Sequence, residues 1–218
     1  MPPSRPTPIS SDFVVVGEGD GDAYFIRNLC EARGIAGMQV EDARGDSKFP
    51  EFLRGLKDRT GFGRLRGLLV VSDNDDAPAE NYKRIRGHLK DTKFPYADAP
   101  LQPARRDGFT VAVMMLPFTG VGGPTRGCLE TLLLRAVEPA NAAVARCIDA
   151  YRACIGGART SNQEDKFRMR CFIAALYRDD PNLSVSFATS QGKGLVNLGH
   201  KCFNEVADFL GSFPNLCA

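Results

Sequence analysis

The chain has 218 residues, of which 43% are hydrophobic and 25% charged, and its formal net charge is +2. This composition is typical of a globular protein with one large core. The near-neutral charge excludes the broad basic field of a nucleic-acid coat protein, although a local basic groove is compatible with it. No apolar run reaches the roughly 18 residues that span a bilayer, so we expect no membrane partner.

The seven cysteines are odd in number and form no C-x-x-C motif. Several lie in apolar, helix-like segments, where cysteine acts as a small hydrophobic residue. We therefore predict reduced thiols and a cytoplasmic location. Residues 1–11 lack an apolar signal core, and we expect them to form a flexible leader.

Strand-like and helix-like segments alternate along the first part of the chain. The valine-rich residues 12–17 predict a buried strand, and residues 23–33 predict a helix that ends at Gly34. A weak strand at 38–41 and a helix at 49–58 follow. The glycine-rich turn after the first strand lacks the spacing of a dinucleotide-binding fingerprint, and its acidic residues would repel a pyrophosphate.

Residues 68–76, LLVVSDNDD, form the most informative stretch of the sequence. Four apolar residues predict a strand buried in a parallel sheet, and ligands bind beyond the carboxyl ends of such strands. The acids Asp73, Asp75 and Asp76 follow at that end. Carboxylates this close repel one another unless a cation lies between them, and hard oxygen ligands suit Mg²⁺ or Mn²⁺. An isolated Asp-x-Asp is also typical of a turn that caps the next helix.

The remaining pattern predicts further α/β structure and then mostly helices. We expect a helix at 79–89 with basic side chains, a loop at 91–106, a strand at 110–116 and a helix at 129–137. The glycine-rich loop 118–127 lacks P-loop spacing. Helices are predicted at 141–155, 163–176 and 195–210, with a short strand at 184–189. The predicted organisation is a leader (1–11), an α/β core (12–137) and a helical extension (138–218) packed on that core as part of one domain.

The order of the acidic motifs resembles that of the TOPRIM domain, which topoisomerases, primases and OLD-family nucleases share. The chain carries Glu18-Gly19, then Asp73-Asn74-Asp75, then Cys128-Leu129-Glu130, and then Lys166 on a helix. The resemblance covers residues 12–212 and is closest to small, stand-alone OLD-like proteins of bacteria. Related nucleases often have Asp-Leu-Glu where this chain has Cys-Leu-Glu, so one outer carboxylate is missing here.

The resemblance implies a TOPRIM-like Rossmannoid parallel sheet flanked by helices, with a metal site for Mg²⁺ or Mn²⁺. It implies that Glu18, Asp73 and Asp75 form the principal site and that Asp22 and Glu130 complete a second one. Lys166 would stabilise negative charge on the reacting phosphate. Candidate contacts to nucleic acid are Lys166, Arg168, Arg170 and Lys193.

The function implied is a metal-dependent nuclease that acts on DNA rather than RNA, in a phage-defence context. Because the chain has no Walker motif, we expect that the nuclease either works alone or takes its ATPase and DNA-guiding functions from a partner ATPase. The main alternative is a TOPRIM-fold binding or regulatory module that works with a partner ATPase or nucleic acid. A third interpretation is another Mg²⁺-dependent phosphotransfer enzyme. A haloacid-dehalogenase phosphatase is disfavoured for two reasons: the motif Asp73-x-Asp75 does not come after the first strand, and the motif is followed by Ala77 instead of threonine or valine.

Overall fold

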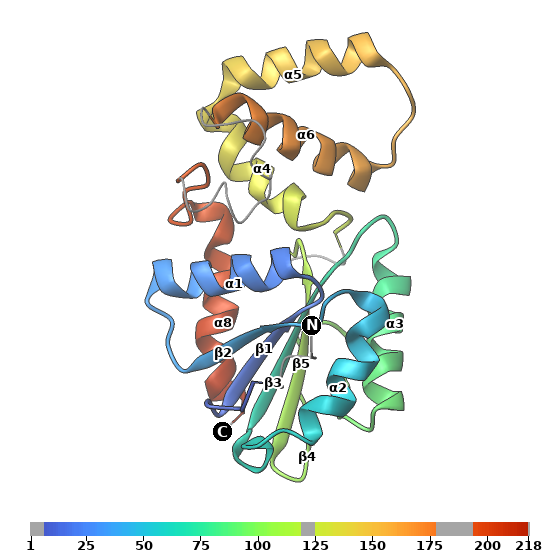
Figure 1. The fold of residues 1–218 in the computed structure, drawn as a ribbon, viewed down its shortest axis with the longest axis vertical. Helices are drawn as coiled ribbons and strands as arrows, with labels where there is room; N and C mark the ends of the chain where they lie inside the picture. Colours follow the sequence, from blue (N-terminus) through green and yellow to red (C-terminus); the bar gives the residue numbers. More distant parts are fainter. Residues whose placement is uncertain (1–6, 119–124, 178–193, 218) are drawn as a thin grey trace, which may run out of the picture. The chain divides into compact units, whose positions relative to one another are not determined.

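The computed structural model describes residues 7–118, 125–177 and 194–217 and has an α/β fold. Within these residues, five strands form one mostly parallel sheet in the order β2-β1-β3-β5-β4 (Figure 1). The strands are β1 (Phe13–Gly17), β2 (Met38–Asp42), β3 (Gly67–Asp73), β4 (Ala104–Arg106) and β5 (Phe109–Leu116). β1 pairs in parallel with both β2 and β3. The predicted α/β sheet flanked by helices is therefore confirmed.

Helices cover both faces of the sheet, which explains why β1 and β3 are continuously apolar instead of alternating. One face packs on α2 (Phe49–Lys57) and α3 (Pro78–Asp91), with Phe49, Ile85 and Val70 in the same buried cluster. α1 (Asp20–Arg33) and α8 (Asn204–Leu216) lie on the other face (Figure 1). Phe213 of α8 contacts Phe13 of β1, with ring centroids 6.3 Å apart.

The β4–β5 hairpin lies partly in the segment predicted as the loop 91–106, and that prediction is wrong for β4. β4 pairs antiparallel with β5. The two are joined by Asp107 and Gly108, whose φ angles are +53° and +77°. An Asp-Gly pair with positive φ at both residues is the favoured two-residue hairpin turn. The strand was missed because Arg105 and Arg106 are exposed and carry no apolar alternation.

The closing helix is shorter than predicted. α8 begins at Asn204 and not at residue 195, and a 3-10 turn (Lys201–Phe203) precedes it. Side chains make the local turns before it: Asn197 Oδ1 accepts from the Gly199 N–H at 2.9 Å, and His200 Nδ1 accepts from the Cys202 N–H at 3.3 Å. Such side-chain bonds to backbone compete with helix formation.

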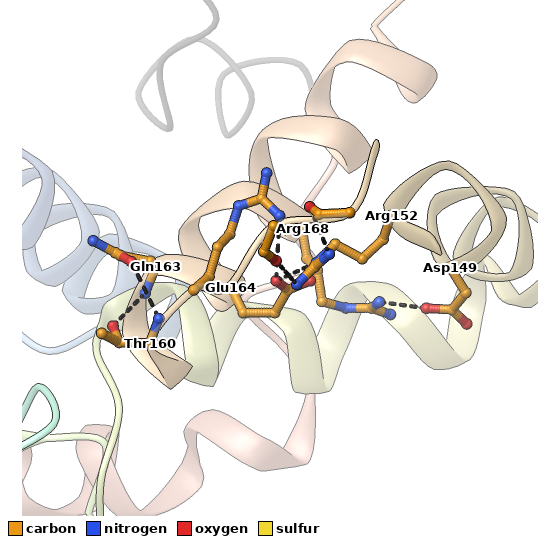
Figure 2. Close-up of polar contacts among 9 residues, drawn as sticks. Asp149, Arg152, Thr160, Gln163, Glu164 and Arg168 are labelled. Atoms are coloured by element: carbon orange, nitrogen blue, oxygen red, sulfur yellow. Dashed lines mark hydrogen bonds and ion pairs between the residues drawn. The ribbon is translucent and has the colours of Figure 1, made fainter. Parts of the chain in front are cut away.

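Three consecutive helices follow β5: α4 (Leu129–Ala140), α5 (Ala142–Ile155) and α6 (Ser161–Leu176). α6 begins with a capping box, in which Thr160 and Gln163 exchange hydrogen bonds of 3.3 Å and 3.1 Å between side chain and backbone (Figure 2). The predicted strand at 184–189 lies outside the described residues.

The chain divides into two compact units. The sheet unit comprises Met1–Ser72, Glu80–Met115 and Ala207–Ala218, and the helical unit comprises Asp73–Ala79 and Leu116–Val206. In the segment predicted as a leader, Ile9 is 2% exposed and its N–H donates to Thr60 O at 2.9 Å. Among the described residues, no helix has both the length and the apolar character needed to cross a membrane.

Candidate metal centre

Asp73, the last residue of β3, is held at the beginning of α4. The Leu129 N–H donates a hydrogen bond of 2.8 Å to Asp73 Oδ1. The first N–H groups of a helix have no partner within the helix, so a carboxylate is a favourable acceptor there. The end of a buried strand and the first turn of a helix thus fix the position of this acid within the helical unit.

Asp73, Cys128 and Glu130 are brought together at this point. One potential ligand atom from each residue lies within 4.8 Å of the other two. Cys128 is fully buried, at 0% exposure, whereas the two acids are partly exposed. Asp73 and Glu130 were predicted as metal ligands. Cys128 was not, because a cysteine in an apolar segment is typical of a small core residue.

Gly127 allows the chain to enter α4 in this geometry. Its φ is +130°, and its N–H donates to Asp75 O at 2.9 Å. A Cβ atom at this position would lie 2.4 Å from Thr131 Oγ1. That hydroxyl accepts from the Cys128 N–H at 3.0 Å and donates to Asp165. A larger residue would therefore disturb the turn that places Cys128 and Glu130.

Lys166 of α6 provides the positive charge beside these groups. Its burial disfavours the charged form, but Glu130, Asp73 and Asp75 outweigh that effect, so the pKa of Lys166 is raised. The pKa of the Cys128 thiol is also raised, first by burial and then by the negative charge of Glu130. The site therefore combines a charged ammonium with a thiol that is protonated at neutral pH.

Asp75 and Asp76 have different partners. Asp75 has φ +48°, in the left-handed region, and Asn162 Nδ2 donates to its Oδ1. The Asn162 N–H donates to Asp76 Oδ1 at 3.3 Å. Asp75 is not a member of the three-residue group, although its charge acts on Lys166. The beginning of α6 is thereby tied to the acidic loop after β3.

The donor set of Asp73, Cys128 and Glu130 fits a divalent cation. Metal–oxygen bonds are about 2.0–2.2 Å long and metal–sulfur bonds about 2.3 Å. Three ligand atoms within 4.8 Å of one another all lie within roughly 2.8 Å of one point, so shifts of about half an ångström bring them to bonding distance of one ion. Two carboxylates and a thiol can therefore hold a metal here.

Glu18 and Asp22, the other predicted ligands, belong to the sheet unit. Ser72 Oγ donates to Glu18 Oε2, and Arg84 Nη2 lies 3.8 Å from the same oxygen. Asp22 Oδ2 accepts from the Gly19 N–H at 3.0 Å, so Asp22 contributes to the cap of α1. That these two acids share a metal with Asp73 stays a prediction.

Arg84 and Asp46 were missed as partners in the sequence. Arg84 of α3 forms an ion pair with Asp46, and His88 Nε2 lies 3.3 Å from Asp46 Oδ1. Burial, and then the charge of Arg84, lower the pKa of His88, so its imidazole is neutral near pH 7. Asp46 is 38 and 42 residues from these partners, and nothing local in the sequence indicated the contacts.

The predicted nucleic-acid contacts have different environments. Arg168 forms an ion pair of 2.6 Å with Glu138 of α4. It also bonds to Asp149 of α5 (Figure 2). Its side chain is only 18% exposed. Arg170, two residues later, is exposed. Lys193 lies outside the described residues. The guanidinium of Arg168 therefore links three helices, whereas Arg170 faces solvent.

A family model described as "Protein of unknown function (DUF3226)" matches residues 12–215 of the chain. No curated protein matches the sequence, and no solved structure matches the fold.

Proposed function

The chain belongs to the DUF3226 family of proteins of unknown function, and we propose that it is a divalent-metal-dependent nuclease that hydrolyses phosphodiester bonds in DNA. The observation that carries this proposal is the convergence of Asp73, Cys128 and Glu130 within 4.8 Å, with the charged Lys166 beside them. Metal-dependent phosphodiester hydrolysis needs oxygen ligands for a cation and a cationic group near the phosphate.

The proposed roles follow from the positions of the side chains. Asp73 and Glu130 supply oxygen ligands, and the Leu129 N–H keeps the Asp73 carboxylate in place. A divalent ion bound there supplies Lewis-acid stabilisation of negative charge and lowers the pKa of bound water. Lys166 neutralises part of the negative charge of the acids and of the phosphate. In this proposal Glu18 and Asp22 are further ligands and Asp75 is a ligand of the principal site.

The choice of DNA rests on the resemblance to OLD-like TOPRIM nucleases. The motifs Glu18-Gly19, Asp73-Asn74-Asp75 and Cys128-Leu129-Glu130 occur in the order that those nucleases have. The mostly parallel sheet, with acids following β1 and β3, supports the same assignment. A partner ATPase and a role in phage defence belong to the proposal on the same ground.

The second candidate is a catalytically weak module that binds a partner ATPase or nucleic acid. The observation in its favour is that protein groups already bond to the acids. Asp73 accepts from Leu129, Asp75 accepts from Asn162, and Lys166 supplies counter-charge. An acidic loop that is neutralised in this way is stable without a metal.

Cleavage assays with purified protein distinguish the two candidates. The substrates are supercoiled plasmid, single-stranded DNA and RNA, each with Mg²⁺, Mn²⁺ or EDTA. We expect metal-dependent cleavage of DNA that is lost in Asp73→Asn. The matched control is Asp98→Asn, the same change at a side chain that is 95% exposed in the sheet unit. Metal binding by folded protein without cleavage of any substrate would contradict the nuclease and favour the binding module.

A further inference from the structure

The candidate metal centre contains a sulfur atom, and this is the feature that distinguishes it from an all-oxygen site. Cys128 Sγ is one of three potential ligand atoms that lie within 4.8 Å of one another, with oxygens of Asp73 and Glu130 as the others. Mg²⁺ requires a nearly ideal octahedron of oxygen ligands, whereas thiolates prefer softer metals. The donor set therefore bears on which metal the site selects.

The surrounding structure fixes the position of this cysteine. Cys128 is the N-cap of α4, and its N–H donates to Thr131 Oγ1 at 3.0 Å. The next residue, Leu129, bonds through its N–H to Asp73. Backbone bonds on both sides thus place the thiol beside the Asp73 carboxylate. Because Cys128 is fully buried, its thiol is held within this group and not in solvent.

The Cys128 thiol lies 3.8 Å from Thr131 Oγ1 and also hydrogen-bonds to the Glu130 side chain. A divalent cation held by Cys128, Asp73 and Glu130 would take the place of the thiol proton, because a coordinating thiol is deprotonated.

We propose that Cys128 is a metal ligand and that, with Asp73 and Glu130, it makes this centre selective for thiophilic divalent cations such as Zn²⁺, Co²⁺ and Cd²⁺ over Mg²⁺. The inference rests on the proposed metal centre of the nuclease and specifies its metal. Relative affinity alone does not test it, because oxygen and nitrogen sites also bind Co²⁺ and Zn²⁺ more tightly than Mn²⁺. The test must detect the metal–sulfur bond itself.

The experiment is an optical titration of the full chain with Co²⁺, which gives a thiolate-to-metal charge-transfer band in the near ultraviolet when sulfur coordinates. The exposed thiols Cys147 and Cys154 are first replaced by serine to remove adventitious binding. In that background we expect the band to saturate at one equivalent of Co²⁺ and to be displaced by Zn²⁺ or Cd²⁺. An excess of Mg²⁺ should leave the band unchanged. This measurement requires no substitution at the site.

Substitutions then assign the band to one residue. Cys128→Ser should abolish it, whereas Cys30→Ser, the same change at another buried cysteine in the sheet unit, should retain it. Cys128→Asp should lose the band, weaken Cd²⁺ binding by at least about tenfold and strengthen Mg²⁺ binding by a similar factor. Thermal melting of each variant verifies that it is folded.

The outcomes separate this inference from the proposed function. Metal-dependent cleavage without a charge-transfer band, or with a band that persists in Cys128→Ser, overturns the thiolate ligand and leaves the nuclease standing. A band that depends on Cys128 in a protein that cleaves no nucleic acid supports the ligand and overturns the nuclease. Equal affinities of Cys128→Asp and the parent protein for Mg²⁺ and Cd²⁺ overturn the proposed selectivity.

Discussion

The Leu129 N–H and the Asp73 carboxylate are joined by a hydrogen bond of 2.8 Å, although the residues are 56 positions apart in the sequence. The bond connects the last residue of β3 with the first residue of α4. Asp73 therefore has two properties that can be tested separately: its carboxylate accepts a hydrogen bond from the helix, and its negative charge attracts a cation.

Two substitutions at Asp73 should separate these properties. Asp73→Asn keeps a carbonyl oxygen as acceptor and removes the charge, so we expect Mn²⁺ affinity to fall at least about tenfold with little change in the free energy of unfolding. Asp73→Ala also removes the acceptor and should cost about a further 1 kcal/mol. Calorimetric titration and urea denaturation measure the two effects. Equal stability of both variants would show that the hydrogen bond contributes nothing.

Gly127→Ala should disturb the turn before α4. The added Cβ would lie 2.4 Å from Thr131 Oγ1, and the φ of +130° is unfavourable for alanine. We expect a loss of about 1–3 kcal/mol in unfolding free energy and weaker metal binding. Gly21→Ala is the control, because a Cβ there meets nothing within 4 Å and its φ is not positive. If Gly127→Ala were as stable as the parent protein, a Cβ atom at residue 127 would not strain the turn before α4.

Lys166→Met should affect metal binding and cleavage in opposite directions. Removing the ammonium leaves the negative charges of Glu130, Asp73 and Asp75 for a cation, so Mn²⁺ should bind several-fold more tightly. Cleavage should fall by about 10²-fold or more if Lys166 stabilises charge on the phosphate. Lys83→Met, the same change at an exposed lysine, is the control. If Lys166→Met bound metal more tightly but cleaved DNA at an unchanged rate, Lys166 would only neutralise the acids and would not act on the phosphate.

Arg168→Met should destabilise the helical unit because it removes ion pairs with Glu138 and Asp149. Partly exposed pairs of this kind contribute together about 1–2 kcal/mol, and the loss should shrink at high salt. Arg170→Met, two residues away and exposed, should change stability by less than about 0.5 kcal/mol. A loss of DNA binding in Arg168→Met without loss of stability would instead favour its predicted role as a phosphate contact.

Tyr82 should make the stability of the sheet unit sensitive to alkaline pH. Burial raises the pKa of Tyr82 from 10.0 to about 12. The folded protein retains this proton more strongly than the unfolded chain. The contribution of protonated Tyr82 to the free energy of unfolding is therefore fully present below pH 10. It decreases between pH 10 and about 12 by about 2 kcal/mol.

Urea denaturation between pH 8 and 11 measures this effect. In Tyr82→Phe the alkaline decrease should be smaller, while loss of the hydrogen bond to Ala97 O, 3.1 Å long, lowers stability at every pH. The exposed Tyr96 provides the matched Tyr96→Phe control. If the unfolding free energies of Tyr82→Phe and the parent protein had identical pH profiles, the alkaline decrease would not come from Tyr82.

Apolar runs and glycine signals in the sequence were sufficient to predict β1, β3 and most of the helices. The end of α1 at Gly34, with φ +65°, is one confirmed example. β4 was missed although Asp107-Gly108 is a strong hairpin signal, because exposed arginines on a three-residue edge strand show no apolar period. Around residue 195 the apolar spacing is helical, but side chains that bond to the backbone at Asn197 and His200 favour turns there instead.

Parts of the candidate site could not be predicted because they depend on contacts distant in sequence. The acids Asp73 and Glu130 were proposed from their motifs, and Cys128 was noticed only as a departure from a family pattern. Its position beside both acids depends on the Leu129–Asp73 bond and on the turn at Gly127. Likewise, Asp46 and Arg84 carry no shared motif, so only the fold brings them together.

The packing of α8 has a consequence for the order in which the protein folds during its synthesis. Phe213 covers Phe13, and Cys217 Sγ fills the space beside Gly67, where it would lie only 2.6 Å from the Cβ atom of any larger residue. The ribosome releases β1 and β3 long before residues 207–217, so one apolar face of these strands stays uncovered while the whole helical unit is translated. The sheet unit therefore completes its core only after the helical unit has been translated.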